Sequence, residues 1–272
     1  MTNNQRNIFL LLLAGFFVIE SCKKNSDDEI QPVTSSTSNT TPTVMTARDS
    51  AIADYNANYL GSAFSSSVGW TGNTSTCNAG TISAAAHNAA IKRINYFRKL
   101  VGLNGNCTMD TTKYSQFQET ALMEDVHGSL SHTPNSSWTC YTATGAAGAG
   151  SSNLAYGGVS SNAIDLFIND FGTGNEPCGH RRWLLYSPRT TFSDGSTNSY
   201  YSIWVFGAGG NTTIPTYIAY PAKGYMPQGL VYDRWSFSIP GAGLSGATVT
   251  MTGPGGNVPL SIISTVSGYG DN

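Results

Sequence analysis

The sequence predicts an α+β fold in which helices precede a series of strands. Two segments, 82–101 and 110–126, carry apolar residues at helical spacing. After Pro188, short β-rich segments alternate with turns of Gly, Pro and Asn. The chain of 272 residues is 40% hydrophobic, which supplies enough apolar surface for a sizeable core and excludes a protein that is disordered throughout.

The first helix is predicted over 82–101, and Gly102 is suited to end it. His87 falls at the edge of its apolar stripe, so we expect a packed histidine there rather than a ligand. The stripe itself consists of apolar residues on one helical face, Ala90, Ile94, Phe97 and Val101.

The second helix is predicted to start at Asp110, a residue type that caps helices, and to run to Val126. Glu124 and Asp125 continue its apolar stripe one turn beyond Ala121. Either the helix has left the core at that point, or the carboxylates point into a cavity. Both readings remain open at the level of sequence.

A third helix is expected over 163–171, with Asp170 on the margin of its apolar cluster. Strands are then expected in five short segments rich in β-branched and aromatic residues, at 200–206, 216–220, 235–239, 247–252 and 259–263. This order predicts an α+β domain over 47–210, followed by a small all-β module over 213–272.

The N-terminus has the layout of a secretory signal over residues 1–21. Its apolar stretch, 8–19, covers about 18 Å as a helix, which is too short for a hydrocarbon core of roughly 30 Å. The segment resembles a bacterial lipoprotein signal, in which Cys22 is acylated. We therefore expect a lipid anchor in the cell envelope, whether periplasmic or surface-exposed, and a flexible tether over 22–46 that is rich in Ser, Thr and Asn.

The remaining four cysteines, an even number in an exported chain, predict two disulfides with three possible connectivities. We favour Cys140–Cys178, because each of these residues lies close to a motif described below. The second bridge is then Cys77–Cys107, which is geometrically awkward because the helix between them is about 30 Å long.

Four segments occur in a fixed order: INYFR at 94–98, LSHTP at 130–134, SNLAYG at 152–157 and GHRRWLL at 179–185. Together they resemble the CAP superfamily of cysteine-rich secretory proteins, antigen 5 and pathogenesis-related-1 proteins, in its bacterial branch. The resemblance covers about residues 46–207 and implies an α-β-α sandwich. Segment 213–272 is similar to a β module appended to such domains, whose pattern normally runs on, so we expect this module to be incomplete.

The resemblance also implies a cleft lined by two histidines and two acidic residues. His132 matches the first histidine, His180 the second, and Asp170 the nearer acid. Ser152, next to Asn153, stands where the family has a glutamate, and Glu124 is a candidate replacement.

Two imidazoles and a carboxylate can hold Zn²⁺ or another divalent metal if His132, His180 and Asp170 converge, because a catalytic zinc site needs three protein ligands and an open position. The sequence contains no His-Glu-x-x-His segment, so the motif of a metalloprotease is missing.

A groove with few charges and aromatic walls would instead suit a sugar, a peptide or a lipid, and its expected walls are Trp138, Tyr141, Tyr156 and Trp183. We predict a lipid-anchored extracytoplasmic protein whose cleft binds such a ligand. The alternatives are a cell-envelope hydrolase and a surface protein for adhesion. A charged fraction of 11% and a net charge of −2 exclude the basic field needed to bind nucleic acid.

Overall fold

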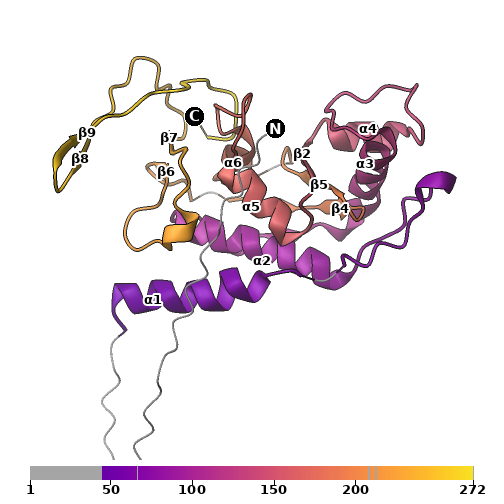
Figure 1. Cartoon of the computed structure of the whole chain (residues 1–272), viewed down its shortest axis with the longest axis horizontal. Coiled ribbons are helices and arrows are strands. Elements are labelled where there is room, and N and C mark those ends of the chain that lie inside the picture. The colour runs from indigo at the N-terminus through magenta and orange to yellow at the C-terminus, as the bar shows by residue number, and fades with distance from the viewer. Residues whose placement is uncertain (1–44, 66, 208, 212, 272) are drawn as a thin grey trace, which may run out of the picture. The chain divides into compact units, whose positions relative to one another are not determined.

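The computed structural model describes residues 45–65, 67–207, 209–211 and 213–271 (Figure 1). The predicted signal segment, the expected acylation site Cys22 and nearly all of the expected tether lie outside these residues. The described residues belong to one compact unit. Within the described part, we find no helix that combines the length and apolar character needed to cross a membrane.

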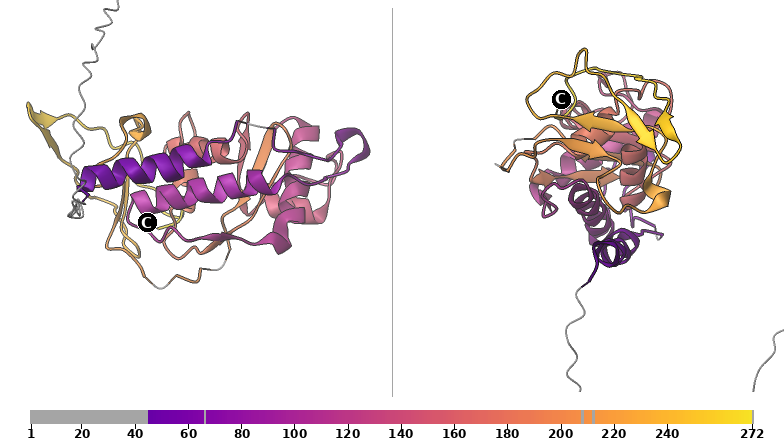
Figure 2. Two further views of the ribbon diagram at one scale, coloured as in Figure 1. Left: turned by 90° about the horizontal axis from the view of Figure 1, so that it is seen from below. Right: turned by 90° about the vertical axis from the view of Figure 1, so that its left-hand side faces the viewer.

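A helical segment that the sequence analysis did not anticipate opens the described chain. Helix α1 (Ala47–Asp54) begins at Thr46 with a capping box and continues through a π-helical turn, Tyr55–Tyr59. Tyr59 packs its ring against Phe97 of α2 (Ala84–Leu100). The first segment therefore runs along α2 (Figure 2).

Helix α2 confirms the predicted helix over 82–101. Ser83 caps it by accepting a hydrogen bond from Ala86 N, and Gly102 follows its end with a left-handed φ of 81°. Its predicted apolar residues Ala90, Ile94 and Phe97 are all buried in the main core. The apolar stripe alone was sufficient to place this helix.

Helix α3 (Tyr114–His127) starts later than predicted. Asp110 does act as a cap, but of a 3₁₀ turn over Thr111–Lys113 that precedes the helix. Helix α4 (Ala143–Ala149), which was not expected, packs against α3. Gly148 permits this close approach, because a Cβ there would lie 2.2 Å from the Thr120 hydroxyl.

The central sheet has three antiparallel strands in the order β2-β5-β4. These strands are β2 (Ser152–Tyr156), β5 (Tyr200–Trp204) and β4 (Asp194–Ser196), with Ser152 opposite Trp204. A separate parallel pair joins β1 (Thr108–Met109) and β3 (Thr191–Phe192). Strand β2 is therefore an edge of the central sheet.

Helices cover both faces of this sheet. On β5, Tyr201 and Ile203 join the core that α2 shares with α5 (Ser161–Asn169). Trp204, on the alternate face, stacks on Phe117 of α3 at 6.2 Å between ring centroids. The fold is thus mixed α and β with the sheet between helices, as the α+β prediction requires.

Helix α5 ends at Asn169, whereas the sequence predicted a helix to residue 171. Asp170 adopts the left-handed region with φ 51°, which stops the helix. Phe171 is 60% exposed and does not join the core stripe. Helix α6 (Gly179–Leu184) follows and carries the GHRRWLL segment.

The C-terminal segment forms two small antiparallel pairs, β6 (Ile218–Tyr220) with β7 (Ser236–Ser238) and β8 (Met251–Gly253) with β9 (Gly256–Val258). The strand predicted at 259–263 was wrong. Pro259 follows β9 directly and has no N–H for a ladder, and Ile262 and Ile263 are more than half exposed. Ile218 and Tyr220 belong to the same core as α2 and α5.

Candidate functional site

A pocket of about 510 Å³ lies along the free edge of β2. Its walls come from the segment after α3, from β2, from α5 and the turn that follows it, and from α6. His132 and His180, 48 positions apart in the sequence, both line it. The remaining lining residues are mostly apolar: Leu130, Ser131, Leu154, Ala155, Tyr156, Leu166, Phe167, Asp170, Phe171 and Asn175.

His180 is held by Asp170. Its Nδ1 lies 2.8 Å from Asp170 Oδ1, and the other carboxylate oxygen accepts a hydrogen bond from Arg181 N. The Asp170 side chain is fully buried, while 28% of the His180 side chain is exposed. A carboxylate oxygen that accepts from Nδ1–H leaves the lone pair on Nε2, which is the ring atom free to meet a ligand.

His132 is held by a backbone carbonyl. Its Nδ1 donates to Ala149 O at the end of α4, at 2.9 Å. A carbonyl oxygen only accepts, so the neutral ring of His132 also keeps its Nε2 lone pair. Both pocket histidines are therefore fixed through Nδ1 in the same tautomer.

Glu124 lies in the last turn of α3 and is 1% exposed, so the helix has not left the core there. Both carboxylate oxygens accept from Ser131 N, at 3.2 and 2.9 Å, and thereby fix the residue before His132. Burial raises the pKa of Glu124 to about 8, against the opposing effect of that hydrogen bond. Glu124 is thus not a pocket-lining residue but supports the segment that carries His132.

Ser152 and Asn153 are buried on β2 and do not line the pocket. The Ser152 hydroxyl donates to Gly148 O and accepts from Ser202, so its hydrogen-bonding capacity is used inside the fold. Asn153 donates from its amide to His180 O at 3.0 Å. Asn153 therefore ties β2 to α6 and helps to place His180.

The expected metal ligands do not form a three-ligand set. Asp170 accepts from His180 Nδ1 with one carboxylate oxygen and from Arg181 N with the other. Among the described residues, no group of three or more His, Cys, Asp or Glu side chains is arranged to hold a metal ion.

The aromatic groove expected from sequence is divided in the structure. Tyr156 lines the histidine pocket, whereas Trp138 and Tyr141 line a second pocket of about 400 Å³ beside α3. Trp183 lines neither of them: it packs against the core, with its ring 4.4 Å from that of Phe206. The four aromatic residues do not form one wall.

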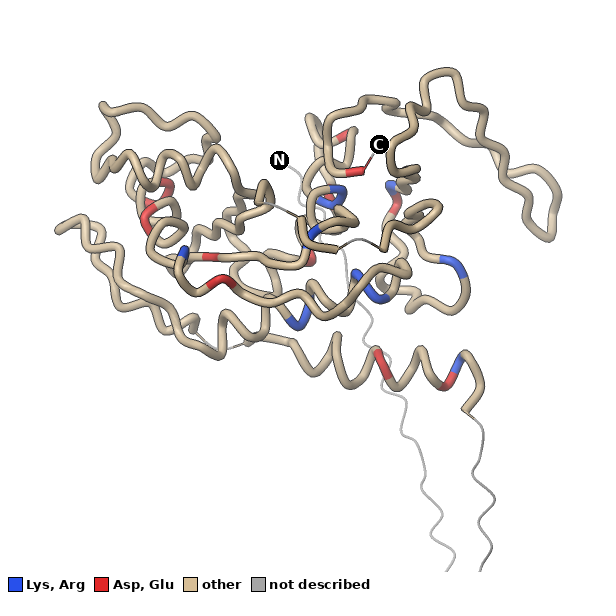
Figure 3. Tube along the Cα trace, turned by 180° about the vertical axis from the view of Figure 1, so that it is seen from behind, with Lys and Arg blue, Asp and Glu red and all other residues tan. Residues whose placement is uncertain are grey.

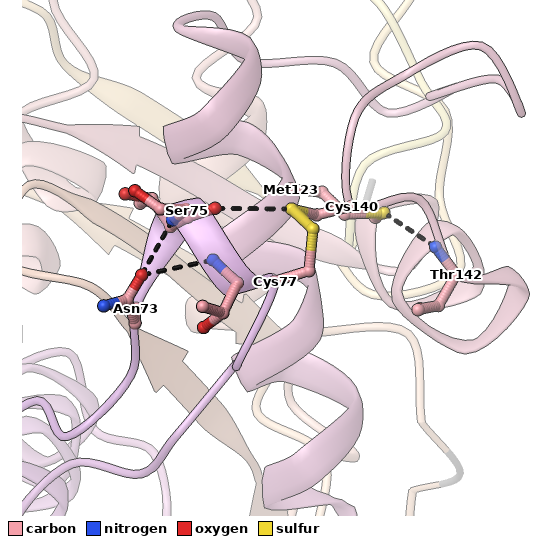
Figure 4. The surroundings of a disulfide bond; sticks show 8 residues. Asn73, Ser75, Cys77, Met123, Cys140 and Thr142 are labelled. Carbon is pink, nitrogen blue, oxygen red and sulfur yellow. Dashed lines mark hydrogen bonds between the residues drawn. A yellow bond between two sulfur atoms is a disulfide. The ribbon is translucent and has the colours of Figure 1, made fainter.

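The predicted disulfide pairing was wrong. The structure joins Cys77 to Cys140 (Figure 4), with 5.1 Å between their Cα atoms. Cys107 and Cys178 are free, buried thiols. The turn that carries Cys77 meets the segment before α4 over α3, while Cys107 packs in the main core. Burial raises the pKa of both free thiols, which makes them poor nucleophiles.

Sequence reasoning missed most of the apolar wall of the pocket. Leu166 and Phe167 lie on α5, whose apolar stripe indicated a core helix, and only the end of α5 near β2 opens to the pocket. Asn175 lies in a turn without any motif. The edge position of β2 could have identified this opening, but the sequence did not predict that strand.

Comparisons of the chain with protein-family models, with curated proteins and with solved structures found no match. The CAP resemblance therefore stays a prediction that rests on the four ordered segments.

Proposed function

We propose that this chain is a lipid-anchored, extracytoplasmic protein of CAP type, whose histidine pocket binds an uncharged amphipathic ligand such as a lipid or a glycolipid. The observation that carries this proposal is that His132 and His180 line one pocket, each with Nδ1 fixed by the protein. Two Nε2 lone pairs in one pocket suit a ligand with hydroxyl groups, because each can accept a hydrogen bond.

The lining chemistry supports the amphipathic character of the ligand. Leu130, Tyr156 and Phe171 at the pocket are each more than 40% exposed, so a bound apolar group would remove this surface from water. Among the described residues that line the pocket there is no lysine or arginine, and the carboxylate of Asp170 is engaged with protein donors. An anionic headgroup would find no lysine or arginine partner among these residues.

The proposed location rests on the N-terminal signal with Cys22 and on the Cys77–Cys140 bridge. Disulfides persist in oxidising compartments, so the bridge supports export from the cytosol. Charged residues of both signs occur as short separate segments along the chain (Figure 3), in accord with a net charge of −2 and with a ligand other than nucleic acid.

The binding proposal is tested with octyl β-glucoside below its critical micelle concentration, with glucose and 1-hexanol as probes of its two halves. We expect the glycoside to bind the wild type more tightly than either half, and the affinity to fall about tenfold in His132→Ala and in His180→Ala, as for the loss of one buried hydrogen bond. The matched control is His127→Ala, an exposed histidine stacked on Trp138 outside the histidine pocket. Equal affinities in all four proteins would overturn the proposal.

A hydrolase is the second candidate, because the His180–Asp170 pair is an imidazole base oriented by a carboxylate. Nε2 of His180 would take a proton from water as its oxygen attacks an ester carbonyl, and would then return the proton to the leaving alkoxide. Turnover of p-nitrophenyl butyrate that is lost in His180→Ala and kept in His127→Ala would favour hydrolysis. Identical rates in both variants would rule out this role for His180.

A further inference from the structure

The turn between α5 and α6, residues 170–175, supplies one wall of the histidine pocket. Asp170, Phe171 and Asn175 all line the pocket from this turn. Asp170, Gly172 and Gly174 have φ values of 51°, 92° and 92°, so half of the turn lies in the left-handed region. Such a turn has no regular series of backbone hydrogen bonds, so other contacts are needed to hold it in one conformation.

Besides local contacts such as Asn175 Nδ2 to Phe171 O, three of these contacts come from one side chain of the C-terminal segment. The Arg234 guanidinium donates from Nη1 to Asp170 O and Asn175 O, and from Nη2 to Gly172 O at 3.1 Å. The planar guanidinium presents several N–H groups in a fixed fork, which lets a single side chain hold three carbonyl groups at once. The first and last residues of the turn are therefore bound to the same group.

A second arginine, Arg181, donates in the same way to backbone carbonyl groups at the end of α5. Arg181 donates from Nε to Ile168 O at 2.6 Å and from Nη2 to Asn169 O at 3.1 Å, while its Nη1 reaches the Ser236 hydroxyl. The carbonyl end of α5 carries the negative pole of the helix, so two guanidinium groups are favourable there. The C-terminal segment is thus linked to the end of α5 directly through Arg234 and indirectly through Ser236 and Arg181.

We infer that Arg234 is a positioning residue of the histidine pocket, so that the C-terminal segment is part of the binding site rather than an appendage to it. This inference rests on the proposed function of that pocket. Arg234 holds the backbone of Asp170, and the Asp170 carboxylate holds Nδ1 of His180. Loss of Arg234 frees the turn, loosens the carboxylate and leaves the tautomer of His180 unspecified.

The inference is tested in the full chain with Arg234→Ala and Arg234→Lys, and with Lys223→Ala as the matched control. Lys223 is an exposed cation of the same segment and does not line the pocket. A lysine keeps the charge at position 234 but cannot span three carbonyls, so we expect it to restore only part of the wild-type behaviour.

The first readout is the tautomer of each histidine, from long-range ¹H–¹⁵N correlation spectra of the four histidines in the chain. In Arg234→Ala we expect His180 to change from the Nδ1–H form to a mixture, while His132 keeps its form because Ala149 O still holds it. General loss of structure would move both signals, which separates positioning from unfolding. Thermal melting of Arg234→Lys provides the second check on folding.

The second readout is the affinity for octyl β-glucoside, which we expect to fall about five- to tenfold in Arg234→Ala and less in Arg234→Lys. An unchanged His180 tautomer in Arg234→Ala overturns the inference, and so does unchanged affinity. If the wild type does not bind the glycoside at all, the proposed function fails, and the tautomer readout still decides the role of Arg234.

Discussion

The protein contains two histidine–aspartate pairs with the same atoms in contact but different surroundings. His180 Nδ1 lies 2.8 Å from Asp170 and His87 Nδ1 lies 2.5 Å from Asp194. Both aspartate side chains are fully buried. The His180 side chain, however, is 28% exposed and lines a pocket, whereas that of His87 is 10% exposed and lines neither pocket described above.

The second partners of each pair explain this difference. Asp194 also accepts from the Tyr201 hydroxyl, and the His87 ring stacks on Tyr114 with 3.8 Å between centroids. This pair joins α2 to the sheet from within. Asp170 accepts its second hydrogen bond from Arg181 N instead. One side of the His180 ring therefore stays open to the pocket. A histidine–aspartate pair is therefore a binding element only where the fold leaves Nε2 accessible.

The largest expected loss of stability concerns the more buried pair, His87–Asp194. Asp194→Ala leaves the Tyr201 hydroxyl and His87 without their buried acceptor, so the free energy of unfolding should fall by about 3–5 kcal/mol. Chemical denaturation measures this loss. Asp233→Ala, an exposed aspartate, should change stability by less than about 0.5 kcal/mol. Equal losses in both variants would contradict a scaffold role for Asp194.

Glu124 provides a third carboxylate, which holds a backbone N–H rather than an imidazole. Its pKa is raised to about 8 in the folded state from 4.5, so the native protein binds the extra proton between those values. Stability should therefore decline as pH rises from 5 to 8, by about 3 kcal/mol at roughly 1.4 kcal/mol per pKa unit.

Glu124→Gln tests this pH dependence, because the amide keeps an acceptor for Ser131 N but does not titrate. Denaturation curves at pH 5 and pH 8 should give a smaller difference in the variant than in the wild type. The same slope in both proteins would show that another group causes the pH dependence.

The smallest expected loss of stability concerns the pair at the pocket, His180–Asp170. Asp170→Asn keeps an acceptor for Arg181 N but presents an amide donor to His180, so the tautomer of the ring should reverse. We expect a stability loss of about 1 kcal/mol and a three- to tenfold weaker affinity for octyl β-glucoside. A loss as large as that of Asp194→Ala, with unchanged affinity, would remove the distinction between the two pairs.

The helices were predictable where packing follows a simple period. Helix α2 buries one clear stripe, and its bounds agree with the sequence prediction to within two residues. Helix α5 was predicted to end two residues too late, because the left-handed conformation of Asp170 depends on contacts with Arg181 and Arg234. Such contacts involve backbone atoms and have no sequence period.

The disulfide shows how far motifs can mislead. Cys140 and Cys178 each lie near a motif in the sequence. That position does not bring the two cysteines together in space. The awkward length of the helix between Cys77 and Cys107 was itself an argument against the pairing that we favoured. The structure instead pairs Cys77 with Cys140.

The sequence predicted the histidines of the candidate site but not the residues that hold them in position. The motifs identified His132, His180 and Asp170 as cleft residues, and all three line one pocket in the structure. They also made Asp170 a candidate metal ligand, and in the structure its two carboxylate oxygens accept from His180 and from Arg181 N. The role of Arg234 could not be derived from sequence, because carbonyl groups are present at every residue.

The most direct test of the binding pocket is a titration of the ¹⁵N-labelled protein with octyl β-glucoside, followed at the Nε2 atoms of all four histidines. We expect the Nε2 signals of His132 and His180 to shift together with one dissociation constant, while those of His87 and His127 stay in place. Shifts confined to His87 or His127, or no shift at either pocket histidine, would contradict the pocket that we propose.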